Sequence, residues 1–256
     1  MIDNKKEIDI ANSFKSVGVL SNDVVMIHGD SGVAAQLTHI EANQRIQELI
    51  RQIIEYFSPE GTVVVPTFSY SFTKNENFDV DNTPGDIGKF SESFRKYPLI
   101  SRSNHPIFSV AGTGKHSNKF EKSRIDDCFG EGTAFDILYK LGGKIICLGC
   151  DFDRVTFAHY VEQYFGVPYR HMKNFSGCII KDGNQNQLTT SYYARKLEIN
   201  PVLDLNLLKK ELINQGKLLT SNIGRFSILA TKTHDFLNCS IQLLKKNNLA
   251  FIKNEI

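Results

Sequence analysis

A histidine and a glutamate stand three positions apart in the segment TFAHYVE, as His159 and Glu162. Side chains at this spacing share one face of a helix, and residues 154–165 carry a helical pattern of apolar residues. A carboxylate there would orient the imidazole and stabilise its protonated form, as a general base working near neutral pH requires. A lone HxxE pattern more often marks a surface ion pair, so the catalytic interpretation needs support from the rest of the chain.

Two glycine-containing stretches are candidate ligand-binding turns. HGDSG at 28–32 follows a short apolar run, and the ends of strands are where α/β sheets bind ligands. TPGDIG at 83–88 combines a proline that fixes one dihedral with glycines that allow close approach, so its amides could bind a phosphate or an amide-bearing chain. The GK[ST] order of a Walker loop is missing. Either stretch could also be a purely structural turn.

Two further stretches carry polar groups on predicted turns. RSNHP at 102–106 could bind a phosphate or orient a thioester through Arg102 and His105. The structural alternative pairs Arg102 with a nearby acid and His105 with the backbone. RSNHP comes after a long polar segment at 69–88, and long loops in compact domains are usually functional, so the binding interpretation is favoured. FGEGT at 129–133 predicts a tight loop before a helix at 134–140.

The composition narrows the class of protein. The chain has 256 residues, 41% of them hydrophobic, and a formal net charge of +2. These values suit one globular domain and disfavour a disordered chain or a dedicated nucleic-acid binder. No run of about 18 uncharged apolar residues is present, and the first twenty residues lack the apolar segment of a secretion signal. We therefore expect a cytoplasmic protein without a membrane span.

The five cysteines fit that compartment. Cys147 and Cys150 form a CxxC, but they lie in KIICLGCDF, which reads as a buried strand and its exit. A redox CxxC normally opens a helix, and no second CxxC or HxxxH follows at zinc-site spacing. We interpret the pair as small core thiols.

Hydrophobic patterning predicts alternating strands and helices. Strands are expected at 24–27, 62–65, 107–113 and 144–149, and helices at 5–18, 40–56, 89–97, 134–140 and 154–165. A hairpin is expected later, with strands at 178–180 and 188–193 around Lys181-Asp182-Gly183, followed by helices at 204–215 and 233–247. This order favours an α/β domain with a mixed sheet between helices.

Taken together and in this order, the stretches resemble the aminoglycoside 3-N-acetyltransferase family, also called the antibiotic N-acetyltransferase family. The resemblance covers roughly residues 20–175, and the tail is similar more loosely, at 216–224 and in the last helix. Five motifs in one order at compatible spacing rarely arise by chance. The matching segments are GTVVVPTFSY, DNTPGDIGKFSESFRKYP, SRSNHPIFSVAGTG and CFGEGTAFDILYKLGGKIICLGCDFDRVTFAHYVEQ.

The resemblance implies a fold, a reaction and an assembly. The fold is a three-layer α/β/α sandwich around a mixed β-sheet, with a late β-hairpin and C-terminal helices. The reaction is transfer of an acetyl group from acetyl-coenzyme A to a primary amine of an amino sugar or aminoglycoside, by direct attack and without a metal. We expect one acyltransferase domain over residues 1–256, with a coenzyme-binding core at about 20–175, a substrate side at about 176–256, and a homodimer.

The resemblance also assigns residues. It makes His159 the general base that takes the proton of the amine, and Glu162 its partner. It places the coenzyme near Asp30, Ser31, Thr83, Pro84, Gly85, Gly88, Arg102, Ser103 and His105. On the substrate side we expect Asp30, Tyr70 and Asp153, because members that act on aminoglycosides bind these polycations with acidic side chains.

Two positions depart from the family pattern. The strand-end motif usually reads His-Ser-Ser, and here it reads His28-Gly29-Asp30. The loop usually reads Thr-Pro-Ser, and here Gly85 replaces the serine. The hydroxyl contacts are absent, while the carboxylate of Asp30 is available for a sugar hydroxyl or an amine.

Three alternatives remain open on the sequence. A metal-dependent hydrolase would use His28 and Asp30, with further ligands among His105, Asp151, Asp153 and His159. A sugar or coenzyme binder without activity would explain the departures. A nucleotide-linked amino sugar of surface-polysaccharide synthesis is an alternative acceptor.

Overall fold

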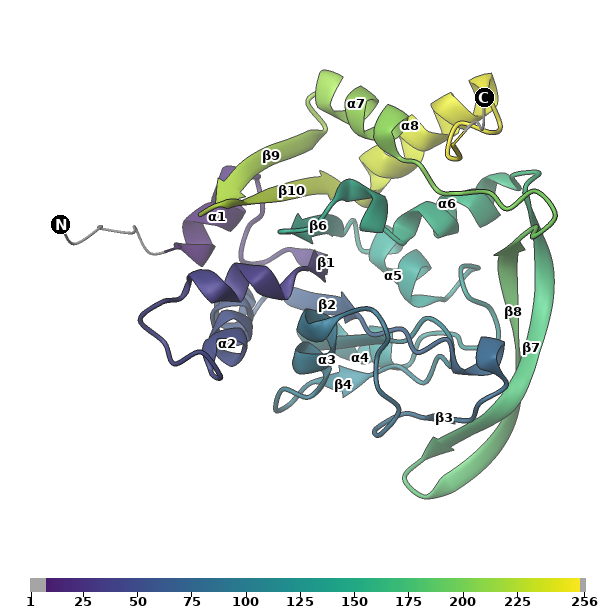
Figure 1. Cartoon of the computed structure of the whole chain (residues 1–256), viewed down its shortest axis with the longest axis horizontal. Coiled ribbons are helices and arrows are strands. Elements are labelled where there is room, and N and C mark those ends of the chain that lie inside the picture. Colours follow the sequence, from purple (N-terminus) through teal and green to yellow (C-terminus); the bar gives the residue numbers. More distant parts are fainter. Residues whose placement is uncertain (1–7, 254–256) are drawn as a thin grey trace.

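A mixed sheet of seven strands forms the centre of the protein in the computed structural model, which describes residues 8–253 (Figure 1). Strand β1 pairs in parallel with β2 and β6, and the other neighbours pair antiparallel. In spatial order the strands are β4 (Ser101–Arg102), β5 (Val110–Gly114), β2 (Thr62–Pro66), β1 (Val24–Gly29), β6 (Lys144–Leu148), β10 (Phe226–Lys232) and β9 (Leu218–Ile223). The carboxyl ends of the three parallel strands meet at one edge, where α/β sheets bind ligands.

Helices cover both faces of this sheet, because successive strand residues point to opposite sides. Val25 and Ile27 of β1 belong to one core cluster, whereas Met26 belongs to the other. The first cluster includes residues of α1 (Ile10–Ser16), α2 (Arg45–Phe57) and α3 (Lys89–Arg95). The second includes α4 (Ser117–Glu121), α5 (Ala134–Lys140), α6 (Phe157–Phe165), α7 (Asn206–Asn214) and α8 (Thr233–Lys246). The expected α/β/α sandwich around a mixed sheet is confirmed.

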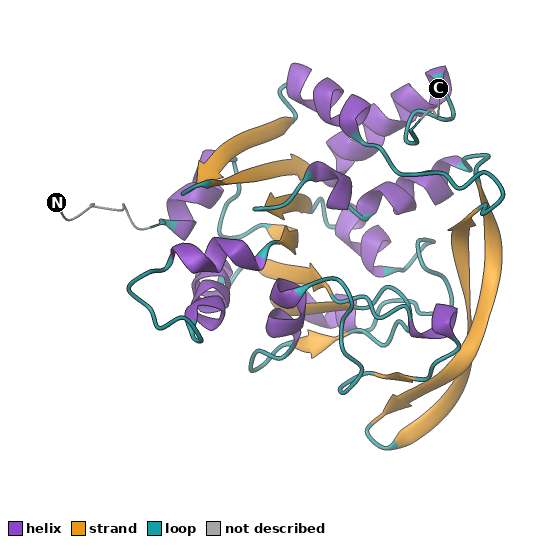
Figure 2. Ribbon diagram, viewed as in Figure 1, coloured by secondary structure: helices purple, strands orange, loops and turns teal. Residues whose placement is uncertain are grey.

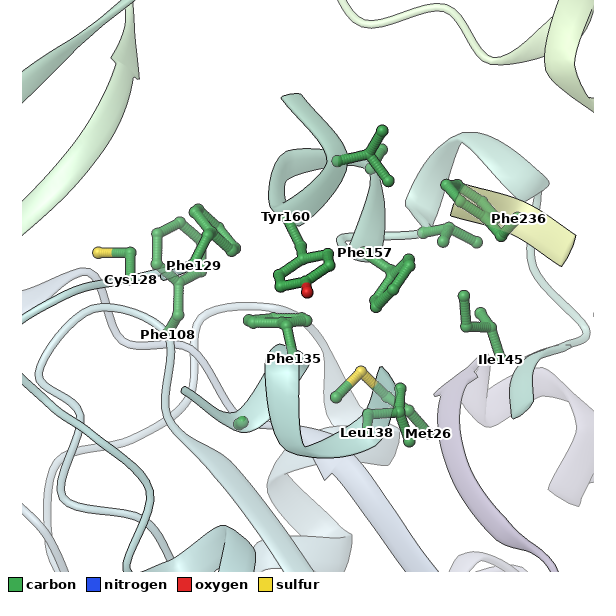
Figure 3. Close-up of a cluster of buried hydrophobic side chains, with 14 of the residues drawn as sticks. Met26, Phe108, Cys128, Phe129, Phe135, Leu138, Ile145, Phe157, Tyr160 and Phe236 are labelled. Atoms are coloured by element: carbon green, nitrogen blue, oxygen red, sulfur yellow. The ribbon is translucent and has the colours of Figure 1, made fainter. Parts of the chain in front are cut away.

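Helix α6 is fixed by aromatic packing in the second core. The rings of Phe157 and Tyr160 stack with their centroids 5.0 Å apart. Figure 3 shows both rings beside Phe135 of α5, and Phe236 of α8 lies against Phe157 at 5.5 Å. The Tyr160 hydroxyl also donates to Asp136 of α5. These contacts hold the helix that carries His159 in one position.

A long curved hairpin runs along one side of the molecule (Figure 2). Strands β7 (Arg170–Lys181) and β8 (Asn184–Arg195) pair over their whole length, and β3 (Phe78–Asp79) extends them to a second sheet. Asp182 and Gly183 form the turn with positive φ, as the common two-residue hairpin turn requires. The turn was predicted correctly, but the strands are much longer than expected. Many of their residues are exposed and polar, so the hydrophobic pattern of the sequence does not mark the full length of either strand.

Other boundaries also differ from the sequence expectations. The first helix begins at Ile10, and residues 5–7 of the expected span lie outside the described part of the chain. Helix α2 begins at Arg45 rather than near residue 40, and α6 follows a separate 3-10 turn, η3 (Phe152–Arg154). Strand β5 begins at Val110, so residues 107–109 belong to a loop. The hairpin β9–β10 and helix α4 were not predicted.

The long polar segment holds short elements of its own, namely η2 (Ser71–Lys74) and β3. Another 3-10 turn, η1 (Ser31–Gln36), follows β1. None of the helices formed by residues 8–253 is long and apolar enough to cross a membrane. All five cysteines have free thiols, and Cys147 is buried while Cys150 donates to the carbonyl of His28.

Candidate active site

His159 and Glu162 form a hydrogen-bonded pair on α6. Nδ1 of His159 lies 2.5 Å from Oε2 of Glu162, and both belong to the same helix face, as their spacing predicts. The Glu162 side chain is fully buried, whereas that of His159 is 19% exposed. Within the described residues, Nε2 of His159 makes no hydrogen bond. The pair is therefore not a surface ion pair: a buried carboxylate holds a ring whose second nitrogen is free to react.

Three side chains besides His159 surround the Glu162 carboxylate. The Tyr169 hydroxyl donates to Oε1 at 2.9 Å, and Nε of Arg170 lies 2.7 Å from Oε2. Burial acts to raise the pKa of Glu162, but its contacts with His159 and the Arg170 cation outweigh the effect of burial and hold the pKa below its usual value. Glu162 is thus an anion in its buried site.

The start of the hairpin supplies Arg170, the first residue of β7. One terminal nitrogen of its guanidinium donates to the carbonyl of Tyr193 on β8, and the other lies 3.0 Å from Nδ1 of His159. The Arg170 guanidinium therefore contacts both the Glu162 carboxylate and the His159 imidazole. Neither Tyr169 nor Arg170 was singled out from the sequence.

Aromatic rings connect His159 to the polar loop. The Phe129 ring meets His159 edge to face at 5.7 Å, and Phe108 packs between Phe129 and Tyr70. Tyr70 is partly buried, and burial, followed by the nearby Tyr192 and Asp86, raises its pKa to about 12. Its backbone lies in the left-handed region at φ +55, which a tyrosine adopts only under constraint. The expected substrate-side Tyr70 is thus joined to the His159 site through ring contacts.

Arg102 organises the loop at 83–88 from the inside. Its buried guanidinium donates to the carbonyls of Thr83 at 2.6 Å and Thr67 at 2.7 Å. Further bonds go to the carbonyl of Val80 and to the hydroxyl of Ser109. Burial, followed by the nearby Arg95 cation, lowers the pKa of Arg102 to about 10, which leaves it charged near neutral pH. The structural alternative of a paired acid is wrong: Arg102 binds carbonyl oxygens of the loop.

Ser103 and His105 are also buried and fix the backbone. The Ser103 hydroxyl accepts from the amide of Val110. Nδ1 of His105 accepts from the amides of Ile107 and Phe108, and Nε2 contacts the carbonyl of Asp127 at 3.1 Å. Burial lowers the pKa of His105 to about 4, so its imidazole is neutral. The backbone bonding that the structural alternative gave to His105 is therefore present.

The outer part of the 83–88 loop is more accessible. The amide of Gly85 donates to the Glu92 carboxylate, and Thr83 bonds through its hydroxyl to the amide of Asp79. Pro84 and Gly88 are exposed, and Gly88 has φ +123 at the start of α3. A side chain at Gly85 would have room, since a Cβ there would meet no atom closer than 3.5 Å.

Asp30, at the end of β1, is exposed. Its carboxylate accepts a hydrogen bond from the amide of Gly32 and so caps the 3-10 turn η1, which begins at Ser31. His28 is buried, its Nε2 has no partner within residues 8–253, and burial lowers its pKa to about 4. Asp153 is exposed and accepts from the amide of Leu205 just before α7.

The metal-hydrolase alternative needs several of the acids and histidines to meet. Across residues 8–253, no three His, Cys, Asp or Glu side chains are grouped so as to hold a metal ion. His105 uses both ring nitrogens on backbone groups, and His159 faces Glu162 and Arg170. The structure does not assemble the cluster that this alternative requires.

Comparison with known proteins shows a consistent relationship. The family model of aminoglycoside 3-N-acetyltransferase matches residues 33–245. Aminoglycoside N(3)-acetyltransferase IV of Salmonella sp is 24% identical over 250 residues, covering 96% of this chain and 90% of that protein. The SPbeta prophage-derived aminoglycoside N(3')-acetyltransferase-like protein YokD of Bacillus subtilis (strain 168) is 26% identical over 199 residues, covering 69% of this chain and 71% of that protein.

A solved structure of AAC-IIIb, binary with CoASH, has a TM-score of 0.77 and 19% identity, covering 92% of this chain and 94% of that one. At this identity the likeness establishes the shared fold.

Proposed function

Because the chain belongs to the aminoglycoside 3-N-acetyltransferase family, we propose that it transfers the acetyl group of acetyl-coenzyme A to a primary amine of an aminoglycoside, with His159 as general base. The observation that carries the proposal is the His159–Glu162 pair, in which a buried carboxylate orients a ring whose Nε2 is unbonded among the described residues. A histidine held by a carboxylate can accept a proton from an amine substrate, which is mostly protonated at neutral pH and must lose a proton before it attacks.

In the proposed step the amine nitrogen attacks the thioester carbon while Nε2 of His159 takes its proton. A C–N bond forms, the C–S bond breaks, and the leaving coenzyme thiolate takes up the proton that Nε2 of His159 received from the amine. Nδ1 of His159 donates to Glu162 throughout, which keeps the lone pair of Nε2 directed outwards. No acyl-enzyme is formed.

We propose that the coenzyme lies along the edge formed by Asp30, Ser31 and the 83–88 loop. Thr83, Pro84, Gly85 and Gly88 would meet the coenzyme, while Arg102, Ser103 and His105 would act from beneath by holding the backbone. For the amine acceptor we propose Asp30, Tyr70 and Asp153 as contacts. The relative in Salmonella is named for aminoglycosides, which makes these amines the first acceptors to test.

The family resemblance supports four further proposals: one acyltransferase domain spanning the chain, a homodimer, a cytoplasmic location and a reaction without a metal. The core at about 20–175 would bind the coenzyme, and residues at about 176–256 would lie on the substrate side. Sedimentation equilibrium tests the dimer, and activity after exhaustive chelation tests the metal.

The central test combines binding with turnover. Acetyl-coenzyme A binding only the folded state should raise its stability by about 2.7 kcal/mol at 100 times the dissociation constant. The protein should then acetylate aminoglycosides, with free thiol released in equal amount. Binding without transfer to any aminoglycoside or nucleotide-linked amino sugar would contradict the proposed reaction. Transfer to a nucleotide-linked amino sugar alone would replace the acceptor and keep the mechanism.

A further inference from the structure

Arg170 contacts both members of the His159–Glu162 pair from a different element. Its side chain is 7% exposed, and its Nε lies 2.7 Å from Oε2 of Glu162. The Nε–H makes no hydrogen bond within residues 8–253, so its contact with the carboxylate is ionic rather than a directed hydrogen bond. A terminal nitrogen of the same guanidinium is 3.0 Å from Nδ1 of His159.

We propose that Arg170 is a positioning residue of the active site, which fixes Glu162 against His159 and opposes protonation of His159 before the amine arrives. This inference rests on the proposed function, because it concerns the same histidine as base.

The proton arrangement around Nδ1 supports this role. Nδ1 cannot donate to Glu162 and accept from Arg170 at once. Its 2.5 Å contact with the carboxylate is the shorter one, so Nδ1 carries the proton and donates to Glu162. The Arg170 nitrogen is then a positive charge beside a ring nitrogen that already holds a proton. A second proton on Nε2 is therefore disfavoured by Coulomb repulsion in a mostly buried site.

The negative charge of Glu162 and the positive charge of Arg170 act on His159 in opposite directions. Glu162 alone would favour the protonated imidazolium, which cannot accept a proton from the amine. Arg170 supplies one opposing unit charge, and the start of α6, where His159 lies in the first turn, also disfavours a cation. During transfer, when the proton leaves the amine, Glu162 still stabilises the cation that forms.

The other titratable groups that face this site are either neutral or, in the case of Asp127, engaged in hydrogen bonds with other groups. Burial raises the pKa of the Tyr169, Tyr192 and Tyr193 hydroxyls and of the Cys128 thiol, so these groups carry no charge near neutral pH. Asp127 accepts bonds from the Gln163 side chain and from the amides of Phe129 and Gly130. Arg170 and Glu162 are therefore the two charges in direct contact with the imidazole.

The test is the pH profile of kcat/KM for Arg170→Met. Loss of the cation leaves Glu162 to favour the imidazolium, so the acidic limb should move to higher pH by about one unit or more. Activity at pH 7 should fall by about tenfold and return towards the parent value at higher pH. Lys173→Met is the matched control, because it removes an exposed cation of the same strand that stacks over Phe175. Its profile should match the parent.

A second pair of variants covers the case in which Arg170→Met does not fold. The double variant Glu162→Gln/Arg170→Met removes both buried charges together, and Glu162→Gln is the reference with which it is compared. Adding Arg170→Met to Glu162→Gln should again move the acidic limb to higher pH by about one unit. Arg170→Lys keeps the charge, and its limb should stay near that of the parent even if its rate falls.

An equal loss of activity at every pH, with the acidic limb unmoved, would overturn the inference and leave Arg170 a structural residue. NMR titration of labelled histidine rings, done without substrate, separates this result from failure of the proposed function. If the parent protein acetylates nothing while the His159 ring titrates at higher pH in Arg170→Met, the reaction is wrong and the role of Arg170 stands. If the ring titration is unchanged, the inference fails whatever the activity.

Discussion

Phe90 lies directly against Gly29, so closely that a Cβ placed on Gly29 would come within 2.4 Å of the phenyl ring. Phe90 is itself buried in the core between the sheet and α3. The departure from the family's strand-end serine therefore has a packing cause in this chain: the phenylalanine occupies the space that a side chain at position 29 would need.

The first prediction follows from this contact. Gly29→Ser should lower the free energy of unfolding by about 1–3 kcal/mol, because the packed core must shift to accept the side chain. Urea denaturation measures the change. Gly85→Ser is the matched control at the other departure, where a Cβ meets nothing closer than 3.5 Å, and it should be nearly neutral. Adding Phe90→Val to Gly29→Ser should recover part of the loss, and an unchanged stability for Gly29→Ser would contradict the packing argument.

The second prediction concerns the proposed base. His159→Gln should reduce kcat by about 10²–10⁴-fold, since the amine then loses its proton acceptor. Coenzyme binding, measured by calorimetry, should change little. His171→Gln removes an exposed histidine of β7 and should leave turnover at the parent level. Turnover in His159→Gln within a few-fold of the parent would remove His159 from its role.

The third prediction concerns the loop held by Arg102. Arg102→Met leaves the carbonyls of Thr83 and Val80 without their side-chain donor, and it removes one of the two donors to the Thr67 carbonyl, which keeps the Ser109 hydroxyl. Each unpaired buried group costs about 1–3 kcal/mol, so the free energy of unfolding should fall by roughly 3 kcal/mol or more. The KM for acetyl-coenzyme A should rise more than kcat falls, because the loop loses its shape. Arg124→Met, which breaks an exposed pair with Asp126, should do neither.

The fourth prediction concerns acid stability. Burial lowers the pKa of both His28 and His105 from 6.5 to about 4. Above pH 6.5 both rings are neutral in the folded and unfolded chain. As the pH falls from 6.5 towards 4, the unfolded chain takes up protons that the folded one does not, so stability is lost in this window, by up to roughly 3 kcal/mol for each ring.

Denaturation in urea at pH 7 and pH 4.5 measures this loss. His28→Met removes one of these two buried rings, and it should flatten the pH dependence without lowering stability at pH 7, because Nε2 of His28 has no partner to lose within residues 8–253. A pH dependence equal to that of the parent would show that His28 titrates alike in the folded and unfolded chain.

The sequence determined the features that depend on short spacing. The short apolar run at 24–27 predicted a strand, and the structure divides Val25 and Met26 of β1 between the two cores. The three-residue spacing of His159 and Glu162 places them on one helix face, because helix geometry is local. The positive φ of Asp182 and Gly183 follows from the residues themselves in the same way.

Tertiary structure decided what each of these groups meets. Arg170 reaches His159 from another element, and no spacing within the chain signals that contact. Arg102 was recognisable as a candidate, but only the fold turned its guanidinium inwards onto the Thr83 carbonyl. The strands β7 and β8 are held by hydrogen bonds to each other, which a pattern of exposed polar residues does not encode. Local geometry fixes which side chains share a face, whereas charge pairing and burial depend on segments that become neighbours only when the chain has folded.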